Sequence, residues 1–317
     1  MNKKYIAGVI LFVLLALFLL GGAWLYSRNK EGSNLRGKYT FAVSRDKINY
    51  LGGIKIVSPE NGEISIYRLA DGSWRFKEAK EYFVNEDMLS AFFKMIKSSI
   101  ILSTVEREGG LAEKNNLTAE RGTVLKTYDY EGKLLDDVIL GKQIEGNQAW
   151  LSKADNESYV YTVSEVNGVF DLPQNWLPYP LLSIETAAIK SVTAGGEKTD
   201  YNELGRKIKH SAAWRDLVRS LNFLEYYGLT FKSDLADLPD YAQIRRIDVK
   251  MLNGMIYKLT AIYVDDSYWI VISMDAGNIF MAEAAELASR AYRYYADWVF
   301  RLSDEQGRTF FADDLVE

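Results

Sequence analysis

The chain has 317 residues, of which 48% are hydrophobic and 13% aromatic, so it can bury a full core and general disorder is excluded. Its 43 acidic residues outnumber its 38 basic residues, and the net charge of −5 argues against nucleic acid as a partner. The chain contains no cysteine and one histidine, so zinc sites, Cys–His nucleophiles and Ser–His–Asp triads are excluded or depend on one residue.

The N-terminal segment has the pattern of a membrane anchor. Residues 5–27 carry no charge, with lysines before them and Arg28 after them. A helix of about 22 residues rises about 33 Å, enough to cross a hydrocarbon core of about 30 Å. We therefore predict a cytoplasmic tail and transmembrane anchor over residues 1–27 and a juxtamembrane linker over residues 28–49. The anchor positions include Tyr5, Ile10, Leu15, Leu20, Trp24 and Tyr26.

Cleavage and orientation of this segment have alternatives. Gly21-Gly22-Ala23 presents small residues where signal peptidase cleaves, so a cleaved signal peptide is the alternative to a retained anchor. Retention is favoured because apolar residues continue through Trp24-Leu25-Tyr26. The basic residues after the segment favour a cytoplasmic domain, but large domains translocate largely regardless of charge. We expect a single-pass protein of the inner membrane whose bulk is extracytoplasmic, in the periplasm.

The next elements form a first α+β unit over residues 50–172. Asn61-Gly62 and Asp71-Gly72 predict turns that connect three strands, because these residues tolerate a positive φ. Asn85 has the chemistry of an N-cap, and apolar residues follow it at helical spacing from Met88 to Ile96. The strands are expected at residues 54–57, 64–69, 74–76, 123–130 and 133–140, followed by strands at 150–151 and 159–163.

The same order of elements recurs in a second unit over residues 184–317. A strand at 189–192 precedes a helix that Ser211 caps, with Trp214 and Leu217 on its apolar face. The chain then predicts a hairpin of 247–252 and 255–262 about Asn253-Gly254, a strand at 269–272 and an Ala-rich helix over 282–295. Residues 173–183 form a linker that holds three of the five prolines. The predicted fold class is α+β: a transmembrane helix, then two repeated units of mainly antiparallel sheet with packed helices.

Several short motifs resemble those of a known family. They are Ile54-Lys55-Ile56, Asp71-Gly72-Ser73-Trp74, Leu140-Gly141-Lys142, Ala149-Trp150-Leu151, Tyr159-Val160-Tyr161-Thr162-Val163, Trp176-Leu177, Leu181-Leu182-Ser183-Ile184 and Trp298-Val299-Phe300-Arg301-Leu302. Over residues 50–305 the chain resembles the bacterial domain of unknown function 4340 family. The resemblance implies an N-terminal membrane anchor, an extracytoplasmic domain and an association with ABC transporters of the gliding-motility type, with no defining enzymatic activity. The chain departs from the family pattern after Val192 and before Thr123.

Carboxylates are the remaining candidates for chemistry. The pairs Asp136-Asp137 and Asp265-Asp266 would suit acid–base catalysis on a glycan, but we expect the first pair to face solvent and the second to form a hairpin tip. Asp234, Asp237 and Asp240 have a spacing that suits Ca²⁺ binding, yet they lack the loop of an EF-hand, which favours a solvated loop. The same interpretation, a solvated loop, is favoured for His210. We predict no catalytic residue, no metal and no cofactor.

Aromatic residues crowd the C-terminal region. Tyr292, Tyr294, Tyr295 and Trp298 are candidates for a partner surface, although helical spacing also suits a buried face. We expect a non-catalytic accessory or scaffolding subunit of an envelope complex, with ABC-transporter subunits as partners. The alternative is a module that binds an envelope polymer, peptidoglycan or polysaccharide, so a glycan ligand stays open.

Overall fold

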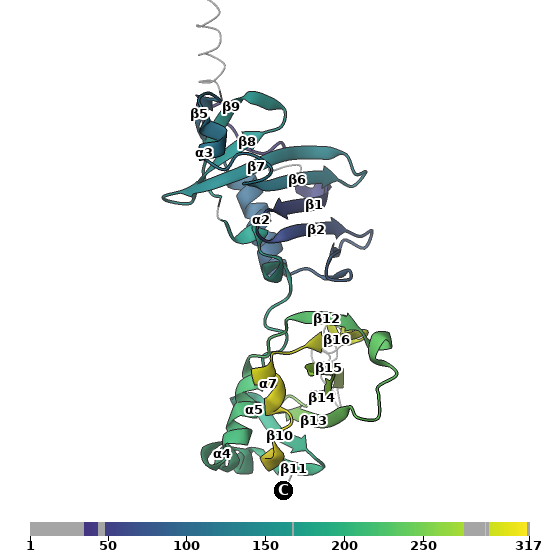
Figure 1. Ribbon diagram of the computed structural model, residues 1–317. Helices are drawn as coiled ribbons and strands as arrows, with labels where there is room; N and C mark the ends of the chain where they lie inside the picture. Colours follow the sequence, from purple (N-terminus) through teal and green to yellow (C-terminus); the bar gives the residue numbers. More distant parts are fainter. Residues whose placement is uncertain (1–34, 44–47, 167, 276–288, 290–291, 316–317) are drawn as a thin grey trace, which may run out of the picture. The chain divides into compact units, whose positions relative to one another are not determined.

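The computed structural model describes residues 35–43, 48–166, 168–275, 289 and 292–315 (Figure 1). The described chain divides into two compact units, the first with residues up to Glu78 and Val84–Trp176, the second with Ala79–Phe83 and the residues after Trp176. Both units consist mainly of antiparallel sheet with a few helices, which is an α+β architecture. The expected anchor at 1–27 lies outside the described residues. Among the helices that are described, none is long and apolar enough to cross a bilayer.

The first unit is built on one antiparallel sheet with the strand order β3-β2-β1-β6-β7-β8-β9-β5. Figure 1 shows helix α2 on one face of this sheet. The strands are β1 (Leu51–Ser58), β2 (Gly62–Arg68), β3 (Trp74–Phe76), β5 (Ile101–Glu106), β6 (Thr123–Asp129), β7 (Leu134–Ile144), β8 (Gln148–Lys153) and β9 (Asn156–Val163). The helices are η1 (Ile48–Tyr50), α2 (Glu86–Ser98), α3 (Leu111–Lys114), η2 (Gly168–Asp171) and η3 (Pro173–Trp176).

Local turn and cap chemistry forms these elements as the sequence predicts. Gly62 and Gly72 have φ angles of 83° and 86°, values that glycine adopts without steric cost. The Asn85 side chain accepts hydrogen bonds from the backbone N–H of Asp87 at 3.0 Å and of Met88 at 3.2 Å, so it is the N-cap of α2. The predicted N-cap and the predicted hairpins of this unit are therefore confirmed.

The second unit contains a sheet with the order β11-β10-β13-β14-β15-β16-β12. Its strands are β10 (Ile189–Ala194), β11 (Glu197–Asp200), β12 (Gly228–Phe231), β13 (Gln243–Met251), β14 (Ile256–Val264), β15 (Ser267–Asp275) and β16 (Trp298–Arg301). Its helices are η4 (Thr186–Ala188), α4 (Tyr201–His210), α5 (Ala212–Asn222), η5 (Lys232–Leu235), α7 (Asp304–Thr309) and η6 (Asp313–Leu315). Helix α4 was not expected from the sequence; most of the expected helix over 282–295 lies outside the described residues.

The two strand orders coincide. Taken in chain order, β1, β2 and β5 to β9 of the first unit correspond to β10 to β16 of the second, with β3 as an addition at one edge. In both sheets the first strand of the unit lies between its hairpin partner and the fourth of the seven corresponding strands, which is β6 in the first unit and β13 in the second. The correspondence covers seven strands, and it includes the outer position of β5 and β12, each of which comes early in its unit but pairs with the last strand.

A short segment from the first half of the chain belongs to the second unit. Tyr82, in strand β4 (Tyr82–Phe83), is 1% exposed and lies edge-to-face against Trp298 and Phe300, with ring centroids 5.0 Å and 5.7 Å away. Its hydroxyl donates a hydrogen bond to the Tyr294 carbonyl oxygen at 3.0 Å. The predicted boundary at the proline-containing linker therefore does not separate all of the residues of the two units, because Ala79–Phe83 packs with the second.

Candidate functional sites

The two carboxylates of the first pair lie in different surroundings. Asp136 is 7% exposed, and its two oxygens accept hydrogen bonds from the Ala42 backbone N–H at 2.6 Å and the Thr127 hydroxyl at 2.8 Å. Asp137 forms an ion pair with Lys126 at 2.8 Å. Successive side chains of a strand point to opposite faces, so the two carboxylates lie on opposite faces of β7. The expectation that both face solvent is wrong for Asp136, which is buried and hydrogen-bonded to the backbone of Ala42 and to Thr127.

The second pair forms the tip of the hairpin between β14 and β15. Asp265 and Asp266 have φ angles of 49° and 53°, as a tight turn requires. The hydroxyl of Tyr241 donates to Asp265 Oδ1 at 2.7 Å, and that of Tyr263 donates to Asp266 Oδ1 at 3.0 Å. These hydrogen bonds raise the pKa of both tyrosines, because ionised hydroxyls would lie beside carboxylates. Each carboxylate holds a tyrosine on the surface of the turn.

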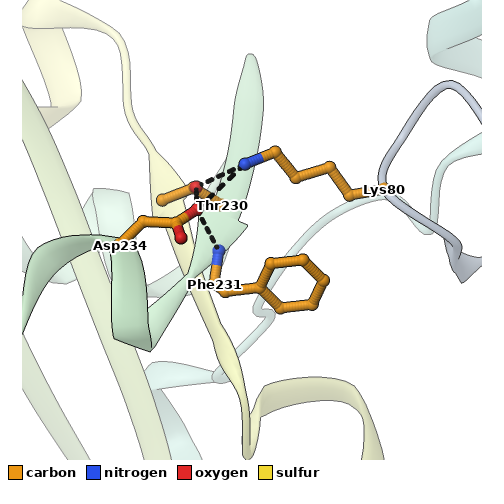
Figure 2. A network of polar contacts seen from close by, with 4 residues as sticks. All are labelled: Lys80, Thr230, Phe231 and Asp234. Atoms are coloured by element: carbon orange, nitrogen blue, oxygen red, sulfur yellow. Dashed lines mark hydrogen bonds and ion pairs between the residues drawn. The ribbon is translucent and has the colours of Figure 1, made fainter.

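Asp234 takes part in a polar network within the second unit (Figure 2). Lys80 Nζ donates to Thr230 Oγ1 at 2.8 Å and to Asp234 Oδ2 at 3.0 Å. The same carboxylate oxygen accepts the Thr230 hydroxyl and the Phe231 backbone N–H, the latter at 3.3 Å. The hydrogen bond from Thr230, and then that from Lys80, lowers the pKa of Asp234. The network connects residues 79–83 to β12, so a structural role accounts for Asp234.

The structure also places the candidate calcium ligands and the single histidine. Across the residues that the structure describes, no group of three or more His, Asp or Glu side chains is arranged to hold a metal ion. Asp234, Asp237 and Asp240 therefore do not form such a group. His210 is exposed, but it is the last residue of α4, so its expected position in a loop is wrong. The high content of charged residues in 201–210 obscured a helix whose one buried residue is Leu204.

The four C-terminal aromatic residues do not share one surface. Tyr292 is 65% exposed, whereas Trp298 is 7% exposed and stacks on Phe231 with ring centroids 4.6 Å apart. Tyr295 is half-buried, and its hydroxyl donates to the Leu181 carbonyl oxygen at 2.7 Å. Tyr294 is half-buried as well. Trp298 is therefore a core residue, and the candidate partner surface is corrected to exclude it.

The first unit contains a cavity of about 450 Å³ that the sequence did not indicate. It opens between the sheet and α2, and its inner wall consists of buried apolar side chains. Its rim carries the carboxylates of Glu60, Glu120 and Asp171 and the guanidinium of Arg121. The inner wall is formed by Ile56, Phe92, Met95, Leu125 and Phe170. Such a cavity can enclose an apolar group while the rim orients a polar one.

Close backbone packing shapes one side of this cavity. A Cβ atom on Gly122 would stand 2.2 Å from the Asn116 carbonyl oxygen, and one on Gly141 would stand 2.2 Å from the Asn115 carbonyl oxygen. Real Cβ atoms do not approach oxygen so closely, so both positions require glycine. The Lys142 N–H also donates to the Asn115 carbonyl at 3.0 Å. The loop that precedes β6 is thus held directly against β7.

The second unit has a cleft of about 520 Å³ beside α5 and α7. Phe223 and Tyr227 line it, and Tyr227 is 70% exposed. Gln306 fixes the backbone here, since its Nε2 donates to the Phe223 carbonyl at 2.7 Å and its Oε1 accepts the Glu225 N–H at 3.0 Å. The charged side chains of the cleft are Asp216, Arg219, Glu225, Glu305 and Arg308.

An exposed aromatic patch lies at one end of the sheet in the first unit. Tyr130 is 53% exposed, and the Arg68 guanidinium lies 5.3 Å from its ring centroid. Leu51 pairs with Asp129, which brings the adjacent residues Tyr50 and Tyr130 to the same end of the sheet. We call Tyr50, Arg68, Tyr130 and Leu134 the Tyr130 patch; its three apolar members are all exposed.

No protein-family model, curated protein or solved structure matches this chain. The resemblance to the domain of unknown function 4340 family therefore stays a prediction from the motifs quoted above.

Proposed function

We propose that this chain is a non-catalytic accessory or scaffolding subunit of an envelope complex, anchored in the inner membrane by residues 1–27, with its two α+β units outside the cytoplasm. The coincident strand orders support a chain built from two repeats of one unit. The family resemblance of the sequence suggests that the complex is an ABC transporter.

The observation that carries the scaffolding role is the Tyr130 patch. Tyrosine and arginine are enriched among the residues that dominate protein–protein interfaces, because they combine a large contact area with a polar group. Here the guanidinium of Arg68 lies over the Tyr130 ring and donates to its hydroxyl. This arrangement restricts both side chains before a partner binds, which lowers the entropic cost of association.

Crosslinking through a tagged C-terminus, followed by detergent extraction and mass spectrometry, tests this proposal. We expect transporter membrane subunits at near-stoichiometric amounts with the unchanged chain and a loss of most of them with Tyr130→Ala. Tyr227→Ala, which removes a tyrosine of the second unit that is even more exposed than Tyr130, is the matched control and should retain the partners. Recovery of the protein alone would contradict the proposal, as would full complementation by a soluble chain that lacks residues 1–27.

The cleft of the second unit favours binding of an envelope polymer as a second candidate function. Tyr179 lies edge-to-face against Phe223, with ring centroids 5.2 Å apart, and its hydroxyl donates to Glu225. The exposed rings provide apolar faces for the C–H groups of a sugar, while the neighbouring charged groups can hydrogen-bond its hydroxyls. The hydrogen bond to Glu225 raises the pKa of Tyr179 to about 12, because an ionised hydroxyl would lie beside the carboxylate.

Sedimentation with purified cell wall tests the second candidate. We expect the unchanged chain to sediment and the Phe223→Ala, Tyr227→Ala double variant to stay in solution, whereas Tyr130→Ala should sediment as the unchanged chain does. Absence of sedimentation at every salt concentration would contradict polymer binding and leave the scaffolding role intact.

A further inference from the structure

We propose that the cavity of the first unit is a binding site for a small apolar cation: an aromatic or branched aliphatic group with an amine on a short chain. The apolar group would enter between the sheet and α2, and the ammonium group would lie at the acidic rim. This inference concerns a different part of the chain from both the Tyr130 patch and the cleft of the second unit.

The inner wall of the cavity determines the apolar part of the ligand. Ile56 and Leu125 are paired across β1 and β6, and Phe92 and Met95 come from the buried face of α2. All four are at most 3% exposed, so they form the apolar base of the cavity, and an apolar group that lies against this base is partly removed from water. A cavity of about 150 Å³ is known to accept benzene, so 450 Å³ suffices for a ring and a short chain.

The rim determines the charge of the ligand. Three carboxylates and one guanidinium line the opening, which leaves an excess of negative charge. The Arg121 Nη1 donates to the Glu113 carbonyl oxygen at 3.4 Å, outside the cavity lining. The hydrogen bond from its own backbone N–H, and then that from Thr118, lowers the pKa of Glu120, because both stabilise the ionised form. An ammonium group is therefore favoured over a carboxylate.

Asp171 is the carboxylate best placed to orient a bound amine. It is half-buried, and its Oδ2 accepts hydrogen bonds from the Ser58 hydroxyl and the Asn61 side-chain amide, both at 3.3 Å. Among the described residues its Oδ1 has no hydrogen-bond partner, and so this oxygen remains available to a ligand. Ser58 is buried and also lines the cavity, so its hydrogen bond restrains the Asp171 carboxylate at the cavity wall.

Calorimetry with two probes of opposite charge tests the proposal. 2-Phenylethylamine and 3-phenylpropionate have the same ring and nearly the same length, but at pH 7 the first is a cation and the second an anion. The full chain is titrated in lipid discs, and empty discs serve as the blank. We expect the amine to bind at least about tenfold more tightly than the carboxylate, as is typical of a charge-assisted contact.

Three variants locate the site. Asp171→Asn should weaken binding of the amine about 3-fold to 10-fold without weakening binding of the carboxylate. Glu131→Gln makes the same change of charge at the exposed turn between β6 and β7 and should leave both probes unaffected. Thr123→Phe places a ring in the cavity and should abolish binding of both probes, with a thermal melt to verify that the variant folds.

Several results would show that the cavity does not bind an apolar cation. Failure of both probes to bind, equal affinity for the two probes, or undiminished binding of the amine by Thr123→Phe would each overturn the proposal. If Asp171→Asn unfolds, Glu120→Gln serves as the second rim variant, because this carboxylate is exposed and its removal should not affect folding. Its expected effect is again a selective loss of affinity for the amine.

Discussion

Replacement of Asp136 should destabilise the first unit far more than replacement of its neighbour Asp137. Asp136→Ala removes the acceptor of two hydrogen bonds, from Ala42 at 2.6 Å and from Thr127 at 2.8 Å. Hydrogen bonds to a charged group contribute about 1.5 to 3 kcal/mol each and are not fully additive, so we expect a loss of about 3 kcal/mol. Asp137→Ala removes a partly exposed ion pair with Lys126, which contributes less than about 1 kcal/mol.

Asp136→Ala should also loosen the backbone around Ala42, in addition to lowering the free energy of unfolding. Its neighbours Phe41 and Val43 are buried at 3% and 1% exposure, and the hydrogen bond to Asp136 fixes the backbone between them. Asp136→Asn retains one oxygen for the Ala42 N–H, and the Thr127 hydroxyl can turn to accept from the new amide. This variant should therefore lose only about 1 kcal/mol.

Urea denaturation combined with hydrogen exchange measures both effects. The free energy of unfolding is compared for Asp136→Ala, Asp136→Asn and Asp137→Ala, and mass spectrometry follows exchange in the peptide that contains Ala42. We expect this peptide to lose protection in Asp136→Ala and to keep it in Asp137→Ala. Equal destabilisation by the two alanine variants, or rapid exchange at Ala42 in the unchanged chain, would refute the reasoning.

Three further substitutions test the backbone and the aromatic core. Gly141→Ala should destabilise the first unit by about 2 to 4 kcal/mol in thermal melts, because its Cβ would clash with the Asn115 carbonyl oxygen. Gly205→Ala, in α4 where a Cβ meets no atom within 4 Å, should instead stabilise by about 0.5 to 1 kcal/mol. Burial raises the pKa of Tyr226 far above its ordinary value of about 10. Since the folded pKa is the higher one, its contribution to stability is complete below about pH 10 and is lost as the pH rises further. Tyr226→Phe should therefore move the alkaline unfolding midpoint upward, as followed by circular dichroism and tyrosinate absorbance.

A different result would contradict the prediction for Gly141 and the prediction for Tyr226. A Gly141→Ala variant that melts with the unchanged chain would mean that the loop before β6 can move away from β7. An alkaline midpoint that Tyr226→Phe leaves unchanged would mean that another group controls unfolding at high pH. The buried Tyr226 hydroxyl has no hydrogen-bond partner within the described structure, so the loss of this oxygen should carry no penalty at neutral pH.

Much of the fold follows from local chemistry that the sequence displays. The Asn-Gly and Asp-Gly turns, the N-caps at Asn85 and Ser211 and the hairpin about Asn253-Gly254 all occur where the sequence predicts them. Each depends on residues within a few positions of one another, so the sequence alone is sufficient. Helix α4 was not predicted, because its charged residues and single buried leucine produce a weak apolar pattern. Strands β5, β11 and β12 were not predicted from the sequence either.

The candidate sites could not be predicted in this way. The cavity of the first unit combines residues from β1, α2, β6, β7 and η2, and its lining residues Ile56 and Asp171 are 115 positions apart in the chain. No periodicity in the sequence identifies which apolar residue lines a cavity and which fills the core, because both require the same side chains. Glycines were the only available signal, since Gly122 and Gly141 mark a close approach of two segments.

The sequence by itself therefore determined the α+β class, the predicted turns and the helix caps at Asn85 and Ser211, since these depend on backbone preferences over short distances, whereas the strand order of each sheet depends on long-range pairing. Only the tertiary structure decided that Asp136 is buried while Asp137 is not, that Trp298 packs in the core, and that Ala79–Phe83 belongs to the second unit. The physical reason is common to all three. Residues far away in the chain determine which side chains are buried and hydrogen-bonded, so the local sequence does not show whether a carboxylate or an aromatic ring lies in the core or on the surface.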